Sequence, residues 1–302
     1  MAVEAASRPR ALSGAGRVQT LLWRIAWLRP LLLLTPPLAW FVLVYLASLA
    51  LLLVTAFWQI NTFTTQIEQV WNLENFRIIF TDPTYRLIIG RTVTMAALVT
   101  VTDVVLAFPF AYFMARVASR RAQTLLFAAV LLPLWASYLA RVYSWILILN
   151  HNGLLNSTLL WLHLPAANIG YTNVAMWIVF SYIWLPFMII PTYAALERVP
   201  DSLLEAAADL GARRWRTTLD VVLPLALPGV VAGSIFTFSL TLGDYIIPQI
   251  VGNSRLMIGQ AVYTLQGTAG NIPLAAAFTV VPMAIMAGYL WMAKRMGAFD
   301  VL

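Results

Sequence analysis

The chain carries a succession of apolar segments, each longer than the ~20 residues that a helix needs to cross the ~30 Å hydrocarbon core of a bilayer. Because lipid offers the backbone no hydrogen-bond partners, helices are the realistic way to span it, and the residue alternation of a membrane barrel is absent. The composition agrees, with 61% hydrophobic and only 10% charged residues. We therefore predict an all-α polytopic membrane protein with six spans: Leu31–Trp58, Thr92–Val117, Ala122–Leu149, Thr172–Leu196, Leu223–Ile247 and Ile272–Ala293.

The distribution of basic residues predicts the orientation of these spans. If the N-terminus is cytoplasmic, 14 of the 19 lysines and arginines fall on the cytoplasmic side, as the positive-inside rule requires. The others are Arg77, Arg86, Arg91, Arg141 and Arg255. Both termini are expected in the cytoplasm. The formal charge of +7 is explained by this topology, so a nucleic-acid partner has no support.

Several kinds of chemistry are excluded by what the sequence lacks. There is no cysteine, and Lys294 is the only lysine. Since Arg295 follows it, the phosphate-binding pattern G-x-x-x-x-G-K-[ST] cannot be written in this chain. The two histidines, His151 and His163, lie in a predicted loop without the spacing of zinc ligands. We expect no catalytic residue, no metal site and no cofactor in this chain.

Three outer connections are predicted. The first, Gln59–Arg91, is long and polar, and the second, Asn150–Tyr171, contains both histidines. The third, Pro248–Asn271, includes an apolar stretch, Leu256–Leu265, that fits a short interfacial or re-entrant helix.

The largest inner loop, Glu197–Pro224, contains a predicted short helix. Ser202 and Glu205 have the spacing of a capping box, and Gly211 suits the left-handed residue that ends a helix. Leu203, Ala207 and Leu210 then form one apolar stripe. By spacing alone, this helix fits two places equally well: the lipid headgroups, or a groove on a soluble partner.

The same loop resembles a known family. Glu205-Ala206-Ala207-x-x-x-Gly211, followed after nine residues by Val221-x-Leu223-Pro224, is similar to the EAA loop of permease subunits of binding-protein-dependent ABC importers. The family pattern has Ile where this chain has Val221. The resemblance covers the whole chain, including the six-span layout, and implies the type I importer permease fold.

The resemblance also implies partners and a division of the chain. It implies a cytoplasmic N-terminal segment (residues 1–30), a six-helix permease domain (residues 31–293) with the EAA coupling loop at 197–224, and a cytoplasmic tail (residues 294–302). The partners would be a second permease, two ATPase subunits that bind ATP and Mg, and a periplasmic binding protein, in a bacterial inner membrane. The residues expected to couple to the ATPase are Ser202, Leu203, Glu205, Ala206, Ala207, Leu210 and Gly211.

Two further segments resemble the polyamine permeases within this family. They are Phe238–Gln249, which reads FSLTLGDYIIPQ, and Trp184–Met188, which reads WLPFM. The resemblance implies spermidine or putrescine, or a similar small organic cation, as the substrate.

Polar residues inside the spans are the candidates for a translocation pathway, because buried ionisable groups in a bilayer are costly. Asp244 lies next to Tyr245, and an acid with aromatic neighbours suits a cationic amine. Alternatively, these charged residues have a structural role: Arg141 pairs with Asp103 or with Asp244, and the ion pair fixes the packing of the helices. The full set of pathway candidates is Asp244, Tyr245, Thr241, Thr237, Asp103, Arg141, Tyr182 and Trp184.

Other functions remain open from the sequence. An ATP-independent secondary transporter or channel, a permease for a solute other than a polyamine, and a membrane scaffold are the alternatives, and the EAA pattern argues against the first and the last.

Overall fold

The computed structural model describes residues 28–61 and 63–295. The chain divides into two units, Met1–Val54 and Thr55–Leu302, and each is treated by itself. The predicted N-terminal segment and tail lie largely outside the described residues.

From residue 28 onward, the first unit is one long apolar helix. It runs through α2 (Leu28–Trp40), the π-helical segment η1 (Phe41–Leu46) and α3 (Ala47–Thr55). Pro36 and Pro37 lie inside α2, and a proline removes an N–H donor and crowds the carbonyl one turn before it. Large apolar side chains, including Leu33, Leu43 and Leu51, are exposed along this helix, as expected of a span that meets lipid or another membrane chain.

The second unit begins with the predicted outer connection, which is partly folded rather than a loop. β1 (Gln59–Ile60) pairs antiparallel with β2 (Ile67–Glu68), and α4 (Glu74–Thr81) follows. The Glu68 carboxylate accepts hydrogen bonds from Asn61 Nδ2 at 2.7 Å and Gln59 Nε2 at 3.2 Å. These bonds favour the charged form and lower the pKa of Glu68 below its ordinary value.

The second predicted span is longer than expected, because α5 (Pro83–Tyr112) starts before Thr92 and continues into η2 (Phe113–Val117). Asp82 caps its first turn by accepting the Thr84 N–H at 2.7 Å, and Pro83 fits the first helical position. Arg86 and Arg91 are therefore helical residues, which corrects the prediction of a loop up to Arg91.

The predicted third span, Ala122–Leu149, is not one continuous helix. The segment is broken into α6 (Arg120–Trp135) and α7 (Tyr138–Leu149), with α8 (Leu154–Trp161) following, and the two parts are bent by 95°. Ala136 and Ser137 have extended ψ angles of 147° and 133°, which no α-helix accommodates. The break brings Tyr138 to Trp184 and to Asp244.

The fourth and fifth predicted spans form the centre of the second unit. α9 (Asn173–Glu197) is confirmed to within a residue, and it is followed by a short helix, α10 (Asp201–Asp209). The fifth span begins earlier than predicted, at α11 (Arg214–Thr217), and passes through η3 (Thr218–Val222) into α12 (Leu223–Gly243). The wider π turn lies just where Pro224 would crowd an α-helical carbonyl.

The chain ends in α13 (Ile246–Ile250), α14 (Ile258–Gly267) and α15 (Ile272–Arg295). The short helix predicted over Leu256–Leu265 is thus present as α14, and the sixth span is confirmed. Within the described residues, five helices are long and apolar enough to cross a membrane, or six if the bent pair is one span.

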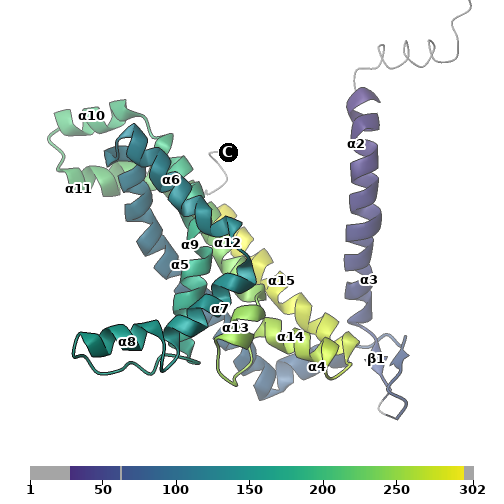
Figure 1. Cartoon of the computed structure of the whole chain (residues 1–302). Helices are drawn as coiled ribbons and strands as arrows, with labels where there is room; N and C mark the ends of the chain where they lie inside the picture. The colour runs from purple at the N-terminus through teal and green to yellow at the C-terminus, as the bar shows by residue number, and fades with distance from the viewer. Residues whose placement is uncertain (1–27, 62, 296–302) are drawn as a thin grey trace, which may run out of the picture. The chain divides into compact units, whose positions relative to one another are not determined.

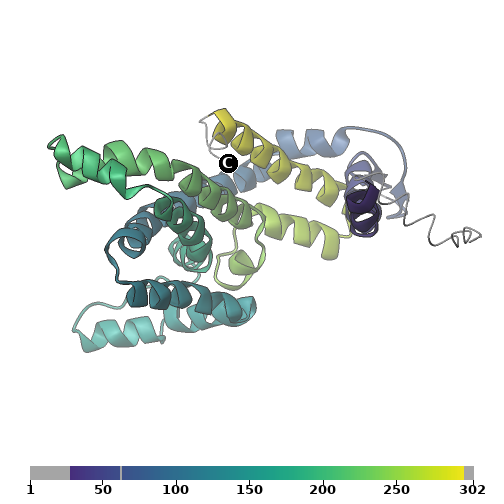
Figure 2. The ribbon, with the colours of Figure 1, turned by 90° about the horizontal axis from the view of Figure 1, so that it is seen from above.

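Packing of α5, α9 and α12 against one another forms the core of this unit. Figure 1 shows α10 and α11 at one end of the bundle and α8, α14 and α4 at the other, and Figure 2 gives the same ribbon from above. The two places of functional interest, the α10 helix and the end of α12 that carries Asp244, therefore lie at opposite ends of the same helix pair, α9 and α12.

Candidate functional site

A cavity of about 380 Å³ lies where α12 ends. Three separate elements supply its walls: the first turn of α7, the middle of α9 and the α12–α13 corner. It is lined by Tyr138, Trp184, Ser239, Leu240, Gly243, Asp244, Tyr245 and Ile246.

Asp244 is the only carboxylate among these lining residues. Its Oδ1 accepts the backbone N–H groups of Ile246 at 2.7 Å and Ile247 at 3.1 Å, so Asp244 caps the first turn of α13. Its Oδ2 accepts a hydrogen bond from the Tyr138 hydroxyl. The carboxylate is therefore held in one orientation, with its charge at the cavity wall.

Aromatic rings surround this carboxylate. Tyr138 and Trp184 stack with centroids 5.8 Å apart, and Tyr245 stacks on Tyr263 at 4.9 Å. Trp184 is nearly buried, whereas Tyr245 is 38% exposed. One negative charge beside several π faces is an arrangement that attracts a cation, because both attract positive charge.

Arg141 does not pair with either predicted aspartate. In the described part of the chain, the ion pairs are Arg77–Glu74 and Arg116–Asp201. Arg141 lies on α7, and its Nε and Nη1 atoms are buried without an acceptor among the described residues. The alternative in which Asp244 is a structural partner of Arg141 is thus not what the structure shows.

Asp103 lies away from the cavity, fully buried on α5. The Ser181 hydroxyl of α9 lies beside its carboxylate, and neither group has another hydrogen-bond partner among the described residues. The structure does not bring Asp103 together with Asp244.

Thr237 and Thr241 of α12, which are also pathway candidates, do not line the cavity. Thr237 and Thr241 are fully buried, and the Thr241 hydroxyl donates to the Thr237 carbonyl at 2.7 Å. Tyr182 packs edge-on against Trp145 at 5.2 Å and does not line the cavity. Of the eight pathway candidates, Asp244, Tyr245 and Trp184 are brought together.

Tyr138 is the aromatic cavity residue that the candidate list omits. It lies 106 positions before Asp244 in the sequence, and it reaches Asp244 because the chain bends before α7. The signal in the sequence is Pro133 followed by Ala136-Ser137, which ends a helix before Tyr138.

The α10 helix has the amphipathic character expected, although its start differs. The helix begins at Asp201 after Pro200, and no side chain caps it. The capping box predicted for Ser202 and Glu205 is therefore wrong. The fixed φ of Pro200 ends the preceding segment, which places Ser202 inside the first turn rather than at the cap.

The end of α10 agrees with the prediction for Gly211. Gly211 has φ of +79°, and its N–H donates to the Ala208 carbonyl at 2.8 Å. The Ala212 N–H donates to the Ala207 carbonyl at 3.0 Å. These two bonds form a Schellman motif, which satisfies the last carbonyls of the helix.

The apolar stripe of α10 faces outward. Leu203 is 42% and Leu210 is 88% exposed, Ala207 is half-buried, and Glu205 and Ala206 are exposed. Leu204, on the other side, packs with Met114 and Leu196 in the cluster between α5 and α9. One face of α10 thus rests on its own chain, and the other presents leucines to the outside.

A single arginine, Arg116 of η2, fastens the corner between α9 and α10. It donates to the Leu196 carbonyl at 2.6 Å, to the Val199 carbonyl, and to Asp201 Oδ1 at 2.6 Å. The Arg116 side chain is 11% exposed. The sequence counts Arg116 only as one of the inner positive charges, because nothing near it signals a buried contact.

No group of three or more His, Asp or Glu side chains that would fit a metal ion occurs among residues 28–61 and 63–295.

Comparison with known proteins identifies the family. Residues 107–296 match the family described as binding-protein-dependent transport system inner membrane component. The chain belongs to this family. It is therefore a multi-pass inner-membrane permease of an ABC importer.

Two curated relatives span most of the chain. The inner membrane ABC transporter permease protein YdcU of Escherichia coli (strain K12) is 46% identical, with 99% of this chain and 98% of the relative covered. The spermidine/putrescine transport system permease protein PotB of the same strain is 31% identical, with 76% of this chain and 85% of the relative covered.

Solved structures show the same fold. A chain of a bacterial alginate ABC transporter in complex with a periplasmic protein matches with a TM-score of 0.72 and 20% identity, covering 93% of this chain and 98% of that one. A chain of the MetNI methionine ABC transporter matches with a TM-score of 0.55 and 19% identity, covering 74% and 99%. The type I importer permease fold expected from the EAA loop is confirmed.

Proposed function

We propose that this chain is the permease subunit of an ATP-driven importer for a small organic cation of the polyamine class. The observation that carries the substrate class is the cavity at the end of α12. It combines the fixed carboxylate of Asp244 with the rings of Tyr138, Trp184 and Tyr245. Similarity to PotB, whose name states spermidine/putrescine transport, supports the same class.

Asp244 would give the cavity its preference for cations. At an effective dielectric between those of water and a protein surface, one carboxylate attracts a unit charge at contact distance by about 1–4 kcal/mol. A second amine of the same substrate would find the aromatic faces. The cavity volume of about 380 Å³ is in the range of small-ligand sites, about 300–1,000 Å³.

The α10 helix would couple this cavity to ATP. Leu203 and Leu210, which are exposed on α10, would insert into a groove on an ATPase subunit, as amphipathic helices do in soluble partners. The packed pair of α9 and α12 joins α10 to the cavity. Closure of the ATPase would move this pair and change the side from which the cavity is open.

The assembly would contain a second permease, two ATPase subunits that hold ATP and Mg, and a periplasmic binding protein that delivers the substrate. The termini and α10 would lie in the cytoplasm, because 14 of the 19 basic residues then fall on that side. Reporter fusions at either terminus check this orientation.

The decisive experiment uses the complex of this chain with its partners in proteoliposomes. We expect ATP-dependent uptake of radiolabelled spermidine or putrescine. In Asp244→Asn, the amide oxygen keeps the cap on α13 while the charge is lost, so the apparent affinity falls about tenfold with thermal stability retained.

Asp82→Asn is the matched control. Asp82 also caps a helix, α5, but it does not line the cavity, and asparagine caps as well as aspartate. Unchanged uptake in Asp244→Asn, or an equal loss in Asp82→Asn, overturns the role of Asp244. Uptake without ATP indicates a secondary transporter instead.

A further inference from the structure

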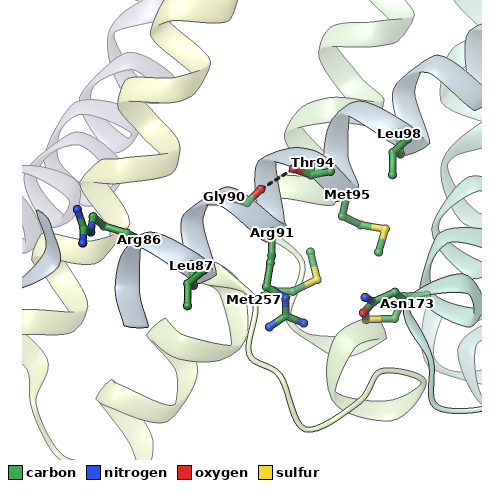
Figure 3. Close-up of a pocket in the computed structure, with 10 residues that line it drawn as sticks. Arg86, Leu87, Gly90, Arg91, Thr94, Met95, Leu98, Asn173 and Met257 are labelled. Atoms are coloured by element: carbon green, nitrogen blue, oxygen red, sulfur yellow. Dashed lines mark hydrogen bonds between the residues drawn. The ribbon is translucent and has the colours of Figure 1, made fainter. Parts of the chain in front are cut away.

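A second groove, of about 340 Å³, runs along α5 at the end opposite to Arg116. Figure 3 shows α5 with Arg91 and Met95 directed toward Asn173 of α9 and toward Met257. Except for the polar side chains of Arg86, Arg91, Thr94 and Asn173, the side chains that line it are apolar: Leu87, Met95, Leu98, Met176 and Met257.

The charge of this groove is positive and unbalanced. Arg91 donates to the backbone carbonyls of Arg255 and Leu256, each at 3.3 Å, and no carboxylate lines the groove. Arg255, in the same loop, is exposed. Arg86 points away from Arg91 in Figure 3, so Arg91 is the fixed cation of the groove.

The length of α5 places this cation at the depth of lipid headgroups. Arg116 and Arg91 are 25 residues apart, which corresponds to about 37 Å of helix, and Leu98 is about 27 Å from Arg116. The hydrocarbon core is about 30 Å thick and the bilayer with its headgroups about 40–45 Å. If Arg116 lies at one interface, Arg91 reaches the opposite headgroup layer while Leu98 stays at acyl-chain depth.

We propose that this groove is a binding site for an anionic phospholipid. The phosphate of the headgroup contacts Arg91, and the upper part of an acyl chain lies along Met95 and Leu98. The match of charge and depth selects this occupant: a cation in the headgroup layer continues directly into an apolar groove. This lipid site does not depend on which substrate is transported, so a test of one proposal does not decide the other.

The test measures the lipid that stays with the purified transporter. The complex is exchanged into detergent containing phosphatidylglycerol and phosphatidylcholine in equal amounts, and bound lipid is quantified by native mass spectrometry. Wild type is expected to retain phosphatidylglycerol preferentially. In Arg91→Gln, the affinity for phosphatidylglycerol falls about tenfold, because the charge-assisted contact is lost.

Two further variants separate a lipid site from a general effect on folding. Gly90→Leu places an apolar side chain in the groove without changing any charge. A Cβ at Gly90 meets no atom within 4 Å, so the backbone has room for a side chain there, and phosphatidylglycerol retention should fall as in Arg91→Gln. Arg77→Gln removes an equal charge from α4, outside the groove, and retention should stay at the wild-type level.

Three results overturn the proposal. Retention unchanged in both Arg91→Gln and Gly90→Leu is one, and an equal loss in Arg77→Gln is another. The third comes from a photo-crosslinking amino acid in place of Thr94: capture of another protein chain instead of lipid shows that the groove is a protein interface.

Discussion

Gly211 is the residue whose conformation most directly determines how the α10 helix ends. Its φ of +79° costs a residue with a β-carbon roughly 1–2 kcal/mol, and a Cβ there meets no other atom within 4 Å. Gly211→Ala should therefore loosen the end of α10 without a steric clash. We expect weaker stimulation of ATP hydrolysis by the binding protein, with the transporter still assembled, and a larger loss in Gly211→Asp, which adds a charge.

The matched control is Gly288→Ala. Gly288 lies inside α15, also in open space, and alanine there favours the helix by up to about 1 kcal/mol. Coupling should be unaffected. Wild-type stimulation of ATP hydrolysis in both Gly211→Ala and Gly211→Asp would show that the end of α10 has no part in coupling.

At the residue scale, the sequence predicts Gly211 but misplaces the helix start. A glycine after a run of helix formers predicts the end of the helix, because few other residues adopt positive φ. Ser202 and Glu205 also have the right spacing, but Pro200 starts the helix at Asp201. Spacing alone does not distinguish a cap from the first turn, because the two differ by a residue or two.

Among the elements, the corner formed by η2, α9 and α10 depends on Arg116. Arg116→Ala removes a charge-assisted donor from two backbone carbonyls and one carboxylate, so we expect destabilisation of about 1.5–3 kcal/mol. Asp201 is 82% exposed, and an exposed ion pair contributes about 0–1 kcal/mol. Asp201→Asn should thus have a much smaller effect than Arg116→Ala.

Thermal unfolding of the purified transporter compares the two variants, with Arg120→Ala as a control for the loss of a positive charge near the same end of α5. If Asp201→Asn destabilises as much as Arg116→Ala, the ion pair and not the carbonyl contacts holds the corner. If Arg120→Ala equals Arg116→Ala, the effect is one of charge alone.

The crossing of α9 and α12 depends on a glycine at the contact. A Cβ on Gly229 would lie 2.4 Å from Ala195 Cβ and 2.5 Å from the Pro191 carbonyl oxygen. Small residues let membrane helices approach this closely. Gly229→Ala should destabilise the transporter by about 1–3 kcal/mol through overpacking.

Gly243→Ala serves as the comparison, because Gly243 ends the same helix and a Cβ there meets nothing within 4 Å. Its unfolding temperature should stay close to that of the wild type. Equal unfolding temperatures for Gly229→Ala and the wild type would mean that the two helices separate at no cost.

The elements themselves are largely predictable from hydropathy, and the exceptions have physical reasons. The fourth and sixth spans agree with the structure, because a long apolar segment in lipid must satisfy its own backbone hydrogen bonds and therefore forms a helix. The 95° bend between α6 and α7 does not follow from hydropathy, because Ala136 and Ser137 interrupt neither the apolar run nor its length. The early start of α5 was missed although Asp82-Pro83 is a helix-start signal, because the polar residues that follow favoured a loop.

For the whole molecule, the sequence predicts the fold and the family but only part of the cavity. Asp244, Tyr245 and Trp184 were predicted from intramembrane charge and neighbouring aromatics. Tyr138 was not, because its contact with Asp244 joins positions 106 residues apart and depends on a bend that hydropathy does not show. A sequence motif predicts structure over a few neighbouring residues. The cavity is formed by three elements that are distant in the sequence, so its lining depends on how these elements pack.

ATP hydrolysis by the assembled complex tests the central claim, that this chain couples ATP to the import of a small organic cation. The complex of this chain with its second permease, ATPase pair and binding protein is reconstituted in lipid, and hydrolysis is measured against the concentration of spermidine or putrescine. The account predicts saturable stimulation by these amines and a shift to about tenfold higher concentration in Asp244→Asn. Stimulation by a neutral or anionic solute, with no response to either amine, would contradict it.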